Sequence, residues 1–317
     1  MRDEVELFGG PEAIFGCRHV AADGEALPAG VVVCSSVGPD APASYGAEAR
    51  LGRALARAGV ATQRFHYRGT GASDGAPADL SFPGMVVDAR AALDRLRTCL
   101  GSSAAIGVVG VRLGTLVAAR LAASLDGAPV VLWSPVADAR HVLEAAARAR
   151  AGQHPVLDRG PAPDIAVGFD AELDPWPAGS GPARHLDRDV DRDVDLDLFD
   201  LPLAAELIDG VVVGSLVDEL RACSGDVLLV QTTAGPAATG RARSLVEQCR
   251  ARGLAVDAAT LTHHHEQDDG VPTPIDDAGP LVDHTASWLV ARLSAAPSTT
   301  AGSSAAPTSA GGGEATP

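Results

Sequence analysis

The sequence predicts an α/β fold in which a mostly parallel sheet of about eight strands carries helices on both faces. Three observations predict it. Short apolar runs alternate with longer amphipathic segments along most of the chain. One of these runs enters a helix through a tight turn flanked by Gly110 and Gly114. The chain has 317 residues, 46% of them hydrophobic, which is enough for one large buried core.

The first half of the chain shows the alternation most clearly. Residues 30–35 form a short apolar run bounded by turn residues, as expected of a buried parallel strand. Ser44 is expected to cap a helix that ends at Gly59. A strand at residues 60–67 leads into a glycine-rich turn at residues 68–75. The remaining elements of this half are predicted as strands at residues 105–109 and 129–133 and helices at residues 85–100, 115–125 and 138–150.

The alternation stops between about residues 151 and 220, which hold prolines, glycines and an acidic and basic run at residues 185–195. We expect this segment to form a cap over the carboxyl ends of the strands, with the charged run in solvent. The alternation resumes after this segment, with predicted strands at residues 227–231 and 254–261 and helices at residues 238–252 and 280–293. The predicted organisation is a single domain over residues 1–293 and a disordered tail, rich in Ala, Ser, Thr, Gly and Pro, over residues 294–317.

Composition excludes several function classes. The formal net charge is −16, so nucleic acid and anionic lipid surfaces would repel the chain, and we expect neither as a partner. All 25 basic residues are arginines, which excludes a P-loop lysine and a Schiff-base lysine. No cofactor motif is present, and we expect no cofactor. Five scattered cysteines, no signal sequence and no long apolar run predict a cytoplasmic protein with reduced thiols.

Residues 105–119 carry the strongest functional signal. A strand, a tight turn between two glycines and an alanine-rich helix form the context of the G-x-S-x-G nucleophile elbow. The central position here is Arg112. A guanidinium stays protonated, so Arg112 can act neither as a nucleophile nor as a general base. The alternative interpretation is an ordinary strand-to-helix turn that contains two glycines.

A second motif favours the elbow. Residues 65–75, FHYRGTGASDG, resemble the R-G-x-G-x-S turn that follows the fourth strand of α/β-hydrolases, and they precede the elbow by the expected distance. Within that superfamily the chain is similar to the serine-aminopeptidase-like hydrolases. It is most similar to the type-2 hydrolases associated with the exosortase A system, in which an arginine at the elbow also occurs. Residues 131–136 and 199–207 add to the resemblance. It implies the α/β-hydrolase fold with a cap insertion.

The resemblance also implies positions for the other triad members, in the order nucleophile, acid, histidine. The acid usually follows the strand at residues 227–231, but residues 232–236 contain no carboxylate. Asp138 is a fallback acid, and the N-cap of the following helix is its alternative role. The histidine is expected after the last strand, where His264 and His265 stand beside His263. An exposed polar loop and a zinc-binding loop are the alternatives for these histidines.

Several hydroxyl groups near the elbow are candidates for binding or for a displaced nucleophile. Thr115 lies one turn into the helix, and Ser35 and Ser36 follow the strand where an oxyanion loop normally begins. Arg68 opens the R-G-x-G-x-S turn and joins them as a predicted binding residue.

Arg112 stands at a helix N-terminus, where the positive end of the helix dipole disfavours a cation. We therefore expect an anionic partner at Arg112. That partner is either a carboxylate of the chain, Asp138 or Glu266, or a small anionic or acyl ligand. Two function classes therefore stay open. One is a degenerate hydrolase that binds a ligand or a partner protein, and the other is an active hydrolase or acyltransferase on an ester, thioester or amide.

Overall fold

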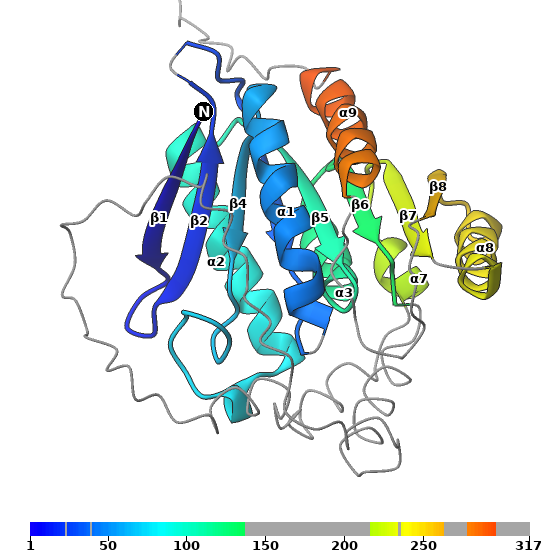
Figure 1. Cartoon of the computed structure of the whole chain (residues 1–317), viewed down its shortest axis with the longest axis horizontal. Coiled ribbons are helices and arrows are strands. Elements are labelled where there is room, and N and C mark those ends of the chain that lie inside the picture. Colours follow the sequence, from blue (N-terminus) through cyan, green and yellow to red (C-terminus); the bar gives the residue numbers. More distant parts are fainter. Residues whose placement is uncertain (23, 39, 137–215, 234–235, 263–277, 296–317) are drawn as a thin grey trace, which may run out of the picture.

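The computed structural model describes residues 1–22, 24–38, 40–136, 216–233, 236–262 and 278–295. Within these residues one eight-stranded sheet runs in the order β1-β2-β4-β3-β5-β6-β7-β8, with helices on both faces (Figure 1). The strands are β1 (Arg2–Phe8), β2 (Ile14–Val20), β3 (Ala29–Cys34), β4 (Ala61–Phe65), β5 (Ala105–Val111), β6 (Val130–Trp133), β7 (Val227–Thr233) and β8 (Val256–Thr262). The helices are α1 (Asp40–Arg57), α2 (Phe82–Leu100), α3 (Gly114–Ala122), α7 (Leu216–Leu220), α8 (Pro236–Ala251) and α9 (Gly279–Ala295), with a 3₁₀ turn at Pro77–Asp79.

The sheet is parallel from β4 through β3, β5, β6 and β7 to β8, while β1 and β2 are antiparallel additions at one edge. This confirms the predicted sheet. The two N-terminal strands were not among the predicted elements. In β1 charged and apolar residues alternate with the period of a half-buried strand, so the signal for this strand is present in the sequence.

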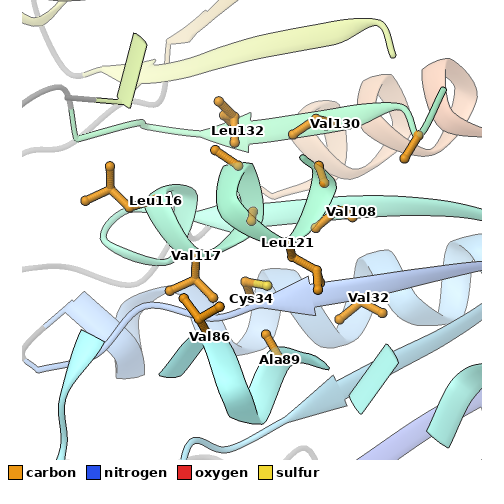
Figure 2. Close-up of a cluster of buried hydrophobic side chains, with 14 of the residues drawn as sticks. Val32, Cys34, Val86, Ala89, Val108, Leu116, Val117, Leu121, Val130 and Leu132 are labelled. Atoms are coloured by element: carbon orange, nitrogen blue, oxygen red, sulfur yellow. The ribbon is translucent and has the colours of Figure 1, made fainter. Parts of the chain in front are cut away.

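Successive residues of the central strands enter two separate cores, because parallel strands are buried on both faces. Val108 belongs to the core beneath α2 and α3, whereas Val109 belongs to the core beneath α1 and α9. Figure 2 shows the first of these cores, in which Val32, Val108 and Leu132 of the sheet meet the side chains of α2 and α3. The apolar stripes of the helices are thus matched to alternate positions on the strands.

Helix boundaries differ from the predicted ones by up to a turn. Helix α1 begins at Asp40, so Ser44 does not cap it. The Ser44 hydroxyl instead donates a hydrogen bond to Oε1 of Glu48 at 2.9 Å. Helix α2 begins at Phe82 because Ser81 caps it, accepting a hydrogen bond from the Gly84 amide at 3.3 Å. Helix α3 ends at Ala122, before the predicted boundary.

Most of the predicted cap, the helix at residues 138–150 and nearly all of the tail lie outside the described residues. The last part of the predicted cap segment is described, and it forms α7. Leu216 and Leu220 are fully buried in the core beneath α3, and Glu219 forms an ion pair with Arg120 of α3. Residues 216–220 therefore belong to the packed domain. Among the described residues, no helix has the length and apolar character needed to cross a membrane.

Candidate functional site

The turn between β5 and α3 has the elbow geometry that the sequence predicts. Arg112 occupies the centre of the turn with a φ of +52°, a left-handed conformation that is strained for a residue with a side chain. Its amide donates to the Trp133 carbonyl at 2.9 Å, which ties the turn to the end of β6. The side chain of Arg112 is partly exposed at the carboxyl ends of the strands.

The two flanking glycines are required by close backbone contacts. A Cβ atom on Gly110 would lie 2.6 Å from the Cα of Thr115 and 2.7 Å from the Cβ of Ala118. A Cβ atom on Gly114 would lie 2.2 Å from the Cys34 carbonyl oxygen and 2.4 Å from that of Ser35. Helix α3 therefore packs directly on β5 and on the end of β3, and this packing holds the elbow.

Thr115 lies beneath the turn and away from solvent. It is fully buried, and its hydroxyl donates to the Arg112 carbonyl at 2.6 Å. This carbonyl also accepts the Thr115 amide at 3.1 Å. The arrangement favours a structural role for Thr115 in the turn, because its hydroxyl is already used and faces no open space.

The loop after β3 brings Ser35 and Ser36 to the same end of the sheet. The Ser35 hydroxyl donates to Oε2 of Glu48 at 2.7 Å. Ser36 is buried, and among the described residues its hydroxyl makes one long contact, of 3.4 Å, with the Val37 carbonyl. Glu48 is a buried carboxylate, 1% exposed, that the sequence reasoning missed. The signal was available, since Glu48 interrupts the apolar stripe of α1 between Ala47 and Leu51.

A pair of hydroxyl groups lies beside the elbow, in the region where the sequence analysis predicts the acid of a triad. Ser134, directly after β6, has a φ of +44° and is buried. Its Oγ lies 2.6 Å from Oγ1 of Thr232 and accepts the Thr232 amide at 3.3 Å. Sequence reasoning noted the missing carboxylate at residues 232–236 but not this pair. Only the left-handed turn at Ser134 brings the two hydroxyls together.

Arg68 is held by carboxylates of the domain. Its Nε donates to Oδ1 of Asp88 at 2.7 Å, and its amide donates to Oδ2 at 2.8 Å. A weaker contact of 3.5 Å joins it to Glu12. The hydrogen bond to the buried Asp88 raises the pKa of Arg68. These contacts fix the R-G-x-G-x-S turn against α2, and a role of Arg68 in ligand binding stays a prediction.

The other predicted site residues, Asp138, His264 and His265, lie outside the described residues, as does Glu266. The described part of the site therefore contains Arg112 at the elbow, the serines after β3 and the hydroxyl pair of Ser134, directly after β6, and Thr232, near the end of β7. The acid and histidine of a triad stay predictions.

Comparison with solved structures agrees with this topology. The chain is similar to Est1E from Butyrivibrio proteoclasticus with ferulic acid bound, at 16% identity and a TM-score of 0.58, over 91% of this chain and 99% of that one. It is also similar to an α/β serine hydrolase homologue from Coxiella burnetii, at 16% identity and a TM-score of 0.51, over 92% and 98% of the two chains. The hypothetical protein PA2218 from Pseudomonas aeruginosa matches at 15% identity and a TM-score of 0.55, over 92% and 94%.

No protein-family model matches the sequence, and no curated protein matches it significantly. The likeness is therefore one of structure. The order of the eight strands, the elbow between β5 and α3 and these structural neighbours lead to one conclusion: the chain has the α/β-hydrolase fold.

Proposed function

We propose that this protein is a non-hydrolytic member of the α/β-hydrolase superfamily that binds a small anionic or acyl ligand at the elbow. The observation that carries the proposal is Arg112 at the centre of the turn, in the left-handed conformation, with a φ of +52°. This conformation presents the central side chain of an elbow outward to a substrate. A guanidinium in that position offers hydrogen bonds and charge but no attacking atom.

Electrostatics favours an anionic ligand. Arg112 stands immediately before α3, whose N-terminal peptide dipoles are positive, and the N-cap residue Leu113 offers no side-chain hydrogen bond. A cation and a positive helix end at one place attract a carboxylate or phosphate. The ferulic acid bound to Est1E is a carboxylic acid, so a protein of this fold holds a ligand of the chemistry proposed here. The resemblance to hydrolases with an arginine at the elbow supports the same proposal.

The alternative is a hydrolase or acyltransferase with a displaced nucleophile. One observation favours it, the hydrogen bond of 2.7 Å from the Ser35 hydroxyl to the buried carboxylate of Glu48. A carboxylate that accepts the hydroxyl proton can serve as a general base. Ser35 also stands after β3, in the loop that approaches the elbow through Gly114.

A fluorophosphonate probe distinguishes the two functions, because it reacts only with activated hydroxyl groups. We expect no stoichiometric adduct on the purified protein when intact mass and peptide masses are measured. We also expect Arg112→Ser to remain unlabelled, because residues 232–236, where the acid is expected, contain no carboxylate. An adduct on Ser35, Ser36, Thr115 or Ser134 would contradict the proposal and establish the displaced nucleophile.

A ligand screen tests the binding role directly. Small carboxylates and acyl phosphates are titrated against the protein, and binding is followed by calorimetry. We expect Arg112→Gln to abolish binding of any anionic ligand and Arg112→Lys to keep part of it, because lysine retains the charge without the planar fork. Equal affinity in the wild type and Arg112→Gln would exclude the elbow as the site.

A further inference from the structure

A cysteine, a histidine and an aspartate form a cluster on β1 and β2, which β4 and β3 separate from the elbow strand β5 (Figure 1). Asp3 of β1 lies directly opposite His19 of β2, and Cys17 precedes His19 by two residues on the same strand. All three side chains therefore stand on one face of the sheet. The Cys17 Sγ lies 3.9 Å from Nε2 of His19, and Nδ1 of His19 lies 2.7 Å from Oδ1 of Asp3.

The hydrogen bonds of Asp3 fix the state of the imidazole. Burial would raise the pKa of Asp3, but the hydrogen bonds from His19 and Arg53 lower it overall, so the group is a carboxylate. A carboxylate only accepts hydrogen bonds, so the proton of the neutral His19 ring is on Nδ1 and Nε2 keeps its lone pair toward the thiol. A nucleophile beside a base that a third group orients is the arrangement of a catalytic triad.

Helix α1 leaves room for this imidazole. His19 is 1% exposed, and a Cβ atom on Gly52, inside α1, would lie 2.2 Å from Cδ2 of the ring. A glycine inside a helix is destabilising relative to alanine. Only glycine fits at this position while the ring stays in place, so α1 holds His19 in one orientation against β2.

Solvent reaches the cysteine but not the histidine. Cys17 is partly exposed, and its backbone is paired with Val5 on one side and Arg64 on the other, so its accessible surface comes largely from the side chain. Val5, on the same face, is 49% exposed, so this part of the face is open. Cys17 also borders a shallow hollow that is open to solvent and has room for about one water molecule. These dimensions favour a reagent close to water in size.

The resting pair of thiol and imidazole is neutral. Burial raises the pKa of Cys17 and lowers the pKa of His19, so the thiol and the unprotonated ring predominate at pH 7. Burial alone would make Cys17 less reactive than an ordinary cysteine, because the thiolate is the nucleophile. The lone pair of His19 changes this, since it can take the thiol proton during the reaction as a general base.

We propose that Cys17 is a site of oxidation by hydrogen peroxide, with His19 as the base and Asp3 as the residue that positions it. Sγ attacks one peroxide oxygen, forming the S–O bond while the O–O bond breaks. The thiol proton passes to Nε2 of His19 and then to the departing hydroxide, which leaves as water. The product is a sulfenic acid, so sulfur is oxidised and the peroxide is reduced. The proposal is independent of the function assigned to Arg112.

The test measures the rate at which hydrogen peroxide oxidises Cys17 in the full-length wild-type protein at pH 7. Dimedone traps the sulfenic acid as a thioether, and peptide masses locate it. The reference is the rate at Cys17 in urea, where the thiol is exposed and no base is held beside it. We expect the folded protein to react at least about tenfold faster, because a positioned base contributes on the order of 10²–10⁴-fold and partial burial offsets some of this gain. A folded rate equal to or below the rate in urea would overturn the proposal.

Two substitutions identify the base and the residue that positions it. His19→Gln should lower the folded rate at Cys17 below the rate in urea, because the thiol then stays partly buried without a base. Asp3→Asn keeps the shape of the side chain. Arg53 still holds one end of it, so the amide group points at Nδ1, moves the ring proton to Nε2 and prevents the ring from taking the thiol proton. We expect at least about a tenfold loss of rate at Cys17.

Cys99 is the control within the same samples. It is exposed on α2, and its Sγ accepts a hydrogen bond from Arg18 at 2.8 Å, with no histidine beside it among the described residues. Its rate should be the same in the wild type and both variants. Circular dichroism checks the fold, and should His19→Gln fail to fold, Asp3→Asn and the comparison with urea decide. An unchanged rate at Cys17 in folded Asp3→Asn would show that the triad arrangement plays no part and would overturn the proposal.

Discussion

At the scale of single residues, the conformation of Arg112 imposes a backbone cost. A left-handed conformation is unfavourable for any residue with a Cβ atom, whereas glycine adopts it freely. The φ of +52° is nevertheless maintained, because the amide is bonded to β6 and the flanking glycines fix the packing on both sides. Backbone strain that is retained in a folded protein is typical of functional positions.

Two substitutions at this position separate the backbone from the side chain. Arg112→Ala and Arg112→Gly both remove the guanidinium, so they lose the same side-chain contacts. We expect Arg112→Gly to be more stable than Arg112→Ala by about 1 kcal/mol, because only alanine retains the strained backbone. Urea denaturation of the two variants measures the difference. Equal stabilities would mean that the turn relaxes when the side chain is removed.

At the scale of secondary-structure elements, the C-terminal helix is attached to the sheet by a buried polar contact. The Trp133 indole nitrogen at the end of β6 donates to the Thr285 hydroxyl of α9 at 2.8 Å. Thr285 is fully buried and Trp133 is 2% exposed. The contact places α9 over the strand that precedes the hydroxyl pair, so it also supports the site.

Removing the Thr285 hydroxyl, which accepts the Trp133 hydrogen bond, should lower the free energy of unfolding more than removing the Thr285 methyl group. Thr285→Val keeps the shape of the side chain but leaves the buried indole N–H unpaired, at an expected cost of about 1–3 kcal/mol. Thr285→Ser keeps the hydroxyl and loses one methyl, at a cost of about 0.8 kcal/mol. The free energy of unfolding in urea checks the order. A Thr285→Val protein as stable as Thr285→Ser would show that Trp133 finds another acceptor.

The elements themselves were largely predictable, because each strand of the parallel sheet is an unbroken apolar run and each covering helix has an apolar stripe. Residues 227–231 illustrate this, since their pattern alone predicts β7. Boundaries were less predictable. Ser44 has the chemistry of a helix cap, but the buried carboxylate of Glu48, one turn later, uses its hydroxyl instead. Tertiary contacts of this kind are not visible in a local pattern.

The site was predictable only where a motif specifies the backbone. Gly110 and Gly114 predict the elbow, because no residue with a side chain fits the close contacts of α3 with β5 and β3. Ser134 gave no such signal. Its importance depends on Thr232 of a neighbouring strand, and that contact is a property of the assembled sheet.

At the scale of the whole molecule, the buried imidazole of His19 and the partly buried imidazole of His66 couple stability to pH. Burial lowers the pKa of His19 and of His66 below the usual value of about 6.5. The unfolded chain therefore binds more protons than the folded one between the lowered values and about pH 6.5, and the folded state loses stability as the pH falls through this range.

The expected result is a lower free energy of unfolding at pH 5.5 than at pH 7.5. The formal charge of −16 also changes in this range, and its weaker self-repulsion at low pH acts in the opposite direction. His66→Asn separates the two effects, because it removes one imidazole and leaves the net charge at pH 7 unchanged. Urea denaturation should give a smaller loss of stability in this variant. An identical loss would mean that His66 titrates normally in the folded protein.

The close contact at Gly114 also bears on how the elbow can respond to a ligand. A hypothetical Cβ there would approach the carbonyl oxygens of Cys34 and Ser35 to 2.2 and 2.4 Å, so the backbones of α3 and of the loop after β3 already touch. Contact this close resists relative movement, so we expect the two segments to move together. A ligand that orders the turn at Arg112 therefore also orders the serines after β3. By thermodynamic reciprocity, a ligand held at those serines strengthens binding at the arginine.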